Sequence, residues 1–334
     1  GKEAMTGTAN NAQTGTIAIG HKALTALTEG AYNLAIGYEA LKEHTTGHRN
    51  IAIGYGAIDQ NGGTNPANSN DNVAMGFNAL GGDWSSAGDG SSDKNIAIGN
   101  YTMDGALLSA HYNIGIGHSA LSGLTQGDAN VVIGFEAGLD LTTGDDNTLI
   151  GYKAGENITA SDQNVIIGSG AGATMSSGTN NCVLIGQAAG DAINSSDAAG
   201  TVAIGYHAGG AITDGQRTTA LGFEAGKAIT TGNDNTFIGY QAGDSGVDSN
   251  GCCIVGQGSD IASDANYANV FGQNITGGAT QMSFVGAGSN YATYNHSTSS
   301  ASWGSTSDVR IKKDIKDIDL GLDFINKIRP VKYK

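Results

Sequence analysis

The chain has 334 residues, of which 54 are Gly and only 2 are Pro, and charged residues make up 14%. This Gly content is far above the roughly 7% of average proteins, and the modest charge excludes a disordered polyelectrolyte. The formal net charge of −15, with only 16 Lys and Arg, argues against nucleic-acid binding and against charge-driven docking on anionic membranes, because both need a basic surface.

Targeting segments and cysteine motifs are not evident in the sequence. No run of about 18 apolar residues occurs, so we expect no membrane span. Residues 1–4 contain neither an initiator Met nor the apolar core of a signal peptide, and we expect a processed chain or a fragment. Cys182, Cys252 and Cys253 lack the CxxC spacing of a zinc motif and do not form a disulfide framework. We interpret them as small apolar packing residues.

Residues 1–15 are small and polar, and we expect an N-terminal lead-in there. From residue 16 to residue 290 one phrase recurs, as in residues 33–40, Asn-Leu-Ala-Ile-Gly-Tyr-Glu-Ala, and the commonest step is 17 residues. A repeat of fixed period indicates stacked structural units. The predicted fold class is therefore all-β, a parallel β-helix or β-roll solenoid of about sixteen repeats. Each copy is anchored on one glycine, and these anchor glycines are Gly20, Gly37, Gly54, Gly76, Gly99, Gly117, Gly134, Gly151, Gly168, Gly186, Gly205, Gly222, Gly239, Gly256, Gly272 and Gly286.

Each position of the phrase has a physical reason. The small and β-branched residues before the glycine suit a short strand with one side chain inside, and a column of Ile and Val is expected to form the core. The glycine lets the backbone turn or approach its neighbour closely. The Asn four residues earlier tolerates left-handed turn geometry and can hydrogen-bond up the stack. Five copies supply the residues assigned to the structural repeat: Asn33, Gly37, Tyr38, Asn50, Gly54, Tyr55, Asn130, Gly134, Phe135, Asn147, Gly151, Tyr152, Asn235, Gly239 and Tyr240.

The aromatic residue after the glycine indicates self-association. Coils that stack at about 4.8 Å would give a rod of roughly 75 Å. A coil of 17 residues, with two or three short strands, encloses little more than one row of side chains. The aromatic column cannot also fit inside, so we expect it to face a second copy of the chain in an obligate oligomer. Gly-, Asn- and Ser-rich insertions at residues 61–70 and 81–93 are expected to be surface loops.

Metal and catalytic interpretations are weaker than structural ones. His44 and His48 are separated by a Thr-Thr-Gly turn that argues against a shared helical face and a metal site. The acidic turns at residues 145–147 and 233–235 could offer oxygens to Ca²⁺, but a solvated turn is favoured. Paired carboxylates could indicate a glycosidase, but recurrence at one register position indicates a structural slot; these residues are Glu39, Glu136 and Glu224. We predict no cofactor and no bound metal.

The repeat fades near residue 290. Residues 291–306 are rich in Ser and Thr and are predicted to be an extended linker. Residues 307–313 read Ser-Asp-Val-Arg-Ile-Lys-Lys, and residues 320–328 have helical apolar spacing that stops at Pro330. Residues 329–333 read Arg-Pro-Val-Lys-Tyr.

Residues 307–334 resemble the start of the intramolecular chaperone of phage tail fibres and tailspikes, the self-cleaving endosialidase-type domain. The resemblance implies that this domain trimerises the fibre and then cuts itself off before Asp308. It also implies that Ser307 is the nucleophile and Lys312 the base that activates it. The domain of this family is longer than residues 307–334, so self-cleavage is not expected of this chain.

The repeats over residues 16–290 are similar to head repeats of trimeric autotransporter adhesins, which form a left-handed parallel β-roll, although the period here is longer. Taken together, the sequence predicts the homotrimeric shaft of a phage tail fibre or related virion appendage that takes part in host attachment. Its partners would be other copies of itself, other virion proteins and a host cell-surface receptor such as a glycan. The alternatives are the head of a bacterial cell-surface adhesin and a glycan-degrading tailspike.

Overall fold

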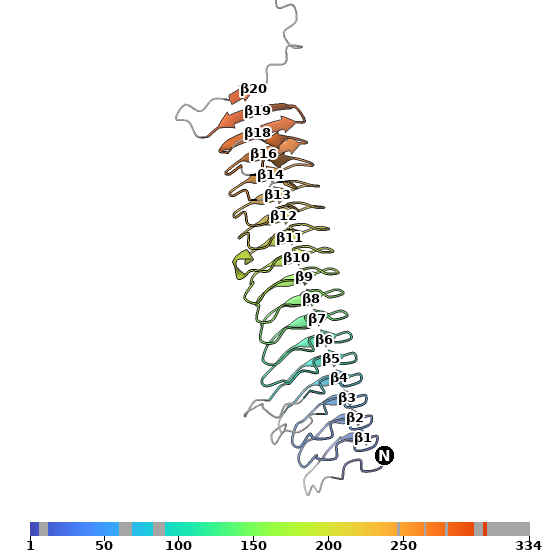
Figure 1. Cartoon of the computed structure of the whole chain (residues 1–334). Coiled ribbons are helices and arrows are strands. Elements are labelled where there is room, and N and C mark those ends of the chain that lie inside the picture. The colour runs from blue at the N-terminus through green and yellow to red at the C-terminus, as the bar shows by residue number, and fades with distance from the viewer. Residues whose placement is uncertain are drawn as a thin grey trace, which may run out of the picture.

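The computed structural model describes residues 1–6, 13–59, 69–82, 91–245, 248–263, 265–277, 280–296 and 303–305. In these residues the chain forms a long rod in which short strands stack from coil to coil, from β1 near the N-terminus to β18, with β19 and β20 beyond it at the far end (Figure 1). The predicted all-β parallel solenoid is therefore confirmed. No helix in the described ranges is long and apolar enough to span a membrane.

Most strands have three residues and occupy the same place in the repeat. The regular elements are β1 Ile17–Ile19, β2 Leu34–Ile36, β3 Ile51–Ile53, β4 Val73–Met75, β5 Ile96–Ile98, β6 Ile114–Ile116, β7 Val131–Ile133, β8 Thr148–Ile150, β9 Val165–Ile167, β10 Val183–Ile185, the 3₁₀ turn η1 Ser196–Ala198, β11 Val202–Ile204, β12 Thr219–Leu221, β13 Thr236–Ile238, β14 Cys253–Val255, β15 Asp260–Ile261, β16 Asn269–Gln273, β17 Thr276–Gly277, β18 Met282–Ala287, β19 Asn290–Asn295 and β20 Trp303–Ser305.

The strands form one parallel sheet in sequence order, with a constant register. Ile17 lies opposite Leu34, and Leu34 lies opposite Ile51. Parallel pairing continues to β16 and β18, after which β19 and β20 pair antiparallel with their neighbours. These two strands, at residues 290–295 and 303–305, lie mostly within the stretch 291–306 that the sequence assigns to an extended linker. Part of that stretch is therefore sheet. A second, two-strand sheet pairs β15 with β17.

The core consists of a few columns of buried side chains that run along the inside of the coils. The middle residue is buried in the three-residue strands from β2 to β14, as are the Ala three residues after the anchor glycine and larger residues beyond it. Ala35, Ala40 and Leu41 of one coil are all 0% exposed. The expected Ile and Val core is wrong for most copies, because those residues flank the buried middle position and point outward. Ile19, for example, is 55% exposed.

Most described coils have one strand, rather than the expected two or three, and the rest of such a coil consists of turns. Left-handed residues recur in these turns, at two and four positions after the anchor glycine, as in Glu39 (φ 56°) and Leu41 (φ 52°). Their N–H groups donate to neighbouring coils, with Glu39 bonded to the His21 carbonyl (2.9 Å) and Leu41 to that of Ala57 (3.0 Å). A left-handed L-residue costs about 1–2 kcal/mol, and these inter-coil bonds offset it.

The anchor glycines are required by both conformation and space. Gly134 has φ 150°, where only glycine is unstrained. A Cβ at Gly134 would collide with the carbonyl oxygen of Gly151 in the next coil, and the same contact recurs from coil to coil. Gly1 stands in the same relation to Gly20, and the Met5 N–H donates to the Ala23 carbonyl (3.0 Å). The stretch that the sequence assigns to a lead-in therefore begins stacked on the first coil.

Candidate functional site

A buried asparagine column runs along the inside of the rod. The side-chain Oδ1 of Asn130 accepts from both the backbone N–H and the Nδ2 of Asn147, each at 3.0 Å. Its Nδ2 donates to the Gly144 carbonyl (2.8 Å) and to Asn113 Oδ1 (3.0 Å). Every polar atom of this 0% exposed side chain is thus bonded, and the amides connect each coil to the next. The column members are Asn33, Asn50, Asn72, Asn95, Asn113, Asn130, Asn147, Asn164 and Asn235.

The left-handed conformation falls one residue before this column. Arg49 (φ 58°) precedes Asn50 and Asp146 (φ 57°) precedes Asn147, whereas no member of the asparagine column has a positive φ. Asn therefore occupies this position for its two-sided amide rather than for its tolerance of turn geometry. Cys182, Thr201 and Thr218 replace it in three successive coils, and there the amide ladder stops.

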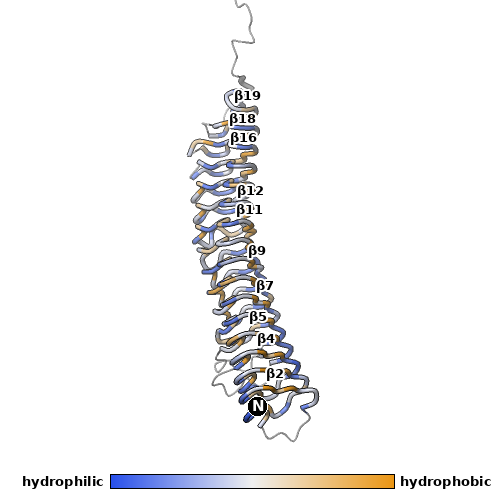
Figure 2. The backbone as a smooth tube through the Cα atoms, turned by 90° about the vertical axis from the view of Figure 1, so that its right-hand side faces the viewer, coloured by the Kyte–Doolittle hydropathy of each residue, from blue (hydrophilic) through white to orange (hydrophobic). Residues whose placement is uncertain are grey.

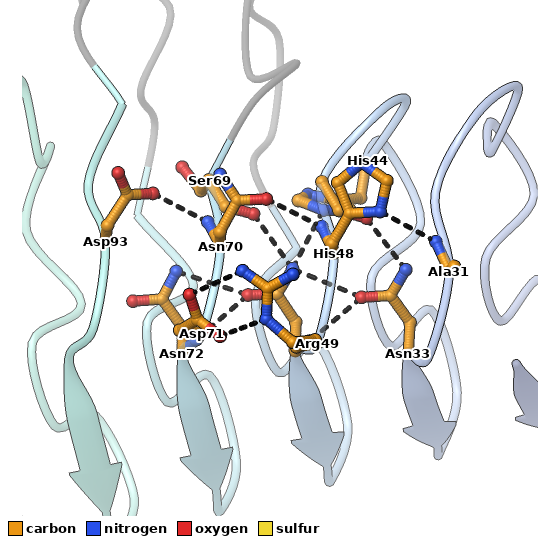
Figure 3. Close-up of polar contacts among 12 residues, drawn as sticks. Ala31, Asn33, His44, His48, Arg49, Ser69, Asn70, Asp71, Asn72 and Asp93 are labelled. Atoms are coloured by element: carbon orange, nitrogen blue, oxygen red, sulfur yellow. Dashed lines mark hydrogen bonds and ion pairs between the residues drawn. The ribbon is translucent and has the colours of Figure 1, made fainter. Parts of the chain in front are cut away.

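A second column, six residues before the anchor glycine, bonds in the opposite direction. Here each side chain accepts from the backbone N–H of the preceding coil: Asp145 Oδ1 from Asp128 (2.7 Å) and Asp162 Oδ1 from Asp145 (3.0 Å). Figure 3 shows both columns near the N-terminal end, where Asn70 accepts from the His48 N–H at 2.9 Å. The sequence analysis missed this column. Its signal was the recurrence of Asp, Asn or His directly after each turn.

This second column gives the acidic turns and His48 a structural role. Asp145 caps the backbone of the coil below, and His48 Nδ1 accepts from the Ala31 N–H at 3.0 Å. No three His, Cys, Asp or Glu side chains come together as a metal site in the described ranges. Arg49 lies beside this column and forms a two-pronged ion pair with Asp71 of the next coil, at 2.5 and 2.8 Å.

His44 is a polar residue in an apolar core position. Leu27 and Leu124 occupy the same place, seven residues after their anchor glycines, and all three are almost fully buried. His44 Nε2 lies 3.1 Å from Asn50 Nδ2, while Nδ1 has no hydrogen-bond partner among the described residues. Burial is the main cause that lowers the pKa of His44 from 6.5 to about 4. The nearby Asp59 shifts the other way, because burial raises the pKa of its carboxyl to about 6.

We expect His44 to make the rod less stable in acid. Its pKa is lower in the folded state, so its contribution to stability is complete above pH 6.5 and is lost as pH falls toward 4. The loss amounts to about 3 kcal/mol at the acid end. His44→Leu should remove this dependence. Guanidinium unfolding of both proteins at pH 7.5 and pH 4.5 measures it, and the comparison cancels the contribution of Asp59. Equal acid sensitivity of the two proteins would show that His44 is not its source.

The recurring glutamates lie in ion pairs on the outside of the turns. Glu39 lies 3.7 Å from Lys22 and 3.4 Å from Lys42. Glu136 lies 3.1 Å from Lys153 of the next coil, and Glu224 lies 2.8 Å from Lys227. These contacts fit a structural slot in which each carboxylate is paired with a cation.

The aromatic column consists mainly of rings one residue after the anchor glycines, and these stack from coil to coil. Tyr38 and Tyr55 have ring centroids 5.0 Å apart with planes 4° from parallel, and Phe135 and Tyr152 stack at 5.5 Å and 9°. Tyr206, Phe223 and Tyr240 form a second run. Ser169 and Gln187 separate the two runs. These rings lie outside the coil, and Tyr38 is 43% exposed.

The remaining residues singled out in the sequence are the three cysteines and the C-terminal Ser–Lys dyad. Cys182 and Cys252 are buried and free, whereas Cys253 is half-buried on the outer side of β14. Ser307 and Lys312, the predicted nucleophile and base, and Asp308 lie outside the described residues.

Comparison with known proteins finds a family match for the C-terminal segment alone. The described part of the chain is a parallel β-solenoid with a buried asparagine column. Residues 307–334 match the family model described as chaperone of endosialidase. No curated protein and no solved structure matches the chain.

Proposed function

We propose that the chain is the structural shaft of a trimeric viral fibre or spike that takes part in host attachment, assembled with the help of the C-terminal chaperone. The observation that carries this proposal is a solenoid rod followed by a match to the chaperone of endosialidase at residues 307–334. Such a rod holds what it carries at a fixed distance, because each coil contacts only its neighbours and its backbone bonds run along the axis.

The chemistry of the described rod fits a mechanical role. The buried asparagine column and the column six residues before the anchor glycines join consecutive coils on two sides, in opposite directions. The recurring glutamates are paired with lysines. In a protein that carries the whole family domain, Ser307 and Lys312 would separate the chaperone from the shaft by cutting before Asp308, once the three chains are aligned.

The native mass of the protein tests this proposal. Light scattering should give three times the chain mass of 33.6 kDa, and negative-stain electron microscopy should show rods of uniform length. The trimer should also persist in detergent at room temperature, because a long interface dissociates slowly. A well-folded monomer under the same conditions would contradict the proposal.

A further inference from the structure

We infer that the outward face of the long sheet is the surface through which copies of this chain bind one another. This inference rests on the proposed trimeric shaft and adds where its subunits meet. The apolar face is defined by three columns: the residues three and one positions before each anchor glycine, and the residue one position after it. In β7 and its following turn these are Val131, Ile133 and Phe135.

The apolar face is exposed in the single chain although its side chains are mostly large and apolar. Ile133 is 36% exposed, Leu221 43% and Tyr240 49%. The strands alternate, with the middle residue buried in the coil and the two flanking residues outside, so the sheet has apolar residues on both faces. In the side view of Figure 2, hydrophobic segments recur from coil to coil along the rod. Sheets whose two faces are both apolar are typical of sheets covered on both sides.

The absence of charge separates this face from the others. The chain has 16 Lys and Arg and 31 Asp and Glu, yet none of them occupies any of the three columns in any of the repeats. The position five residues before the anchor glycine is different and includes Arg49, Asp71 and Lys94. A contiguous uncharged apolar strip of this length is rare on a monomer and marks an interaction surface.

The length and period of the face identify the partner as a second copy. The face extends from β1 to β18 and repeats once per coil. A partner that covers it needs the same length and the same rise per coil, and another rod of this chain has both. Cyclic symmetry about an axis parallel to the rods places equal heights of the subunits side by side, so that the apolar columns of one subunit meet those of the next.

A pair of charge substitutions on this face and one control elsewhere test the inference. Leu221→Lys and Ile133→Lys each place an ammonium in the apolar face, where the side chain points away from the core. Tyr267→Lys is the control, because Tyr267 is 58% exposed and lies five residues before its anchor glycine, the position that holds charged residues in other coils. We expect the two face variants to be monomers with an unchanged β-type circular dichroism spectrum, whereas the control keeps the native mass.

The outcomes separate this inference from the proposed function. Face variants that remain trimers alongside a trimeric parent would overturn the inference alone. A monomeric parent would overturn both. If a face variant does not fold, maleimide labelling decides: a Cys placed at Leu221, which is 43% exposed in the single chain, should react with a bulky maleimide at least ten times more slowly than a Cys placed at Tyr267, which is 58% exposed. Equal labelling rates would refute the inference.

Discussion

Gly134→Ala is expected to disrupt the stack. The new methyl group would meet the Gly151 carbonyl oxygen of the next coil, at a φ of 150° that L-residues rarely adopt. Relief requires two coils to move apart, and this breaks the bonds that connect them, including the 2.8 Å bond from the Gly151 N–H to the Ile133 carbonyl. We expect a loss of about 4 kcal/mol or more, which belongs to the exceptional class of single substitutions.

Gly170→Ala is the matched control. Gly170 also has a positive φ, at 66°, but a Cβ there would have no neighbour within 4 Å. Its cost should be only that of a left-handed alanine, about 1 kcal/mol. Guanidinium unfolding followed by circular dichroism, with yields of soluble protein, compares the two variants. Similar losses for both would show that backbone conformation, and not close approach of the coils, makes the anchor glycines necessary.

The period of the repeat was enough to predict the solenoid, because stacked units must repeat their chemistry at each coil. It was not enough to predict which side of each strand faces inward. In Leu34-Ala35-Ile36, hydrophobicity alone favours the larger residues as core, yet Ala35 is buried and Ile36 points outward. A thin coil encloses only the middle side chain of the strand, and this limit is a property of the closed coil rather than of the strand sequence.

The sequence also did not predict how large and small core residues compensate for one another along the rod. In the N-terminal coils a large residue four positions after the anchor glycine is followed by an alanine in the strand of the next coil, as with Leu24 and Ala35. From β8 onward a larger strand residue often meets a glycine there instead, and a Cβ on Gly138 would approach Leu149 Cδ1 to 2.9 Å. The residues that compensate for one another in size lie in neighbouring coils, so their relation can be recognised only once the coils are stacked.

The polar columns were predicted in part. The asparagine column was recognisable because the same amide recurs before the strand. The column six residues before the anchor glycine mixes Asp145, Asn180 and His111, which share only a side-chain acceptor within reach of a backbone N–H. Sequence recurrence shows identical residues more readily than it shows residues with one shared function.

Asn130→Leu is expected to be the most damaging substitution that leaves the backbone conformation unchanged. Leucine has a similarly branched side chain, but it removes the acceptor of the Asn147 N–H and the donor to the Gly144 carbonyl. It also ends the bond to Asn113 Oδ1. Each buried group left without a partner costs about 1–3 kcal/mol, so the total should be roughly 3–5 kcal/mol. Unlike a surface substitution, it should interrupt the ladder in both directions.

Asn130→Thr provides the comparison, because threonine already occupies this column in two coils. Thr201 Oγ1 donates to the Ala198 carbonyl at 2.7 Å, which replaces one of the bonds of the amide. We therefore expect Asn130→Thr to lose about half as much stability as Asn130→Leu. Amide hydrogen exchange resolves the effect along the rod: the leucine variant should lose protection first at the Asn147 N–H and its neighbours in β7 and β8. Uniform loss of protection over all coils would indicate instead that the rod unfolds as one unit and that the ladder has no local role.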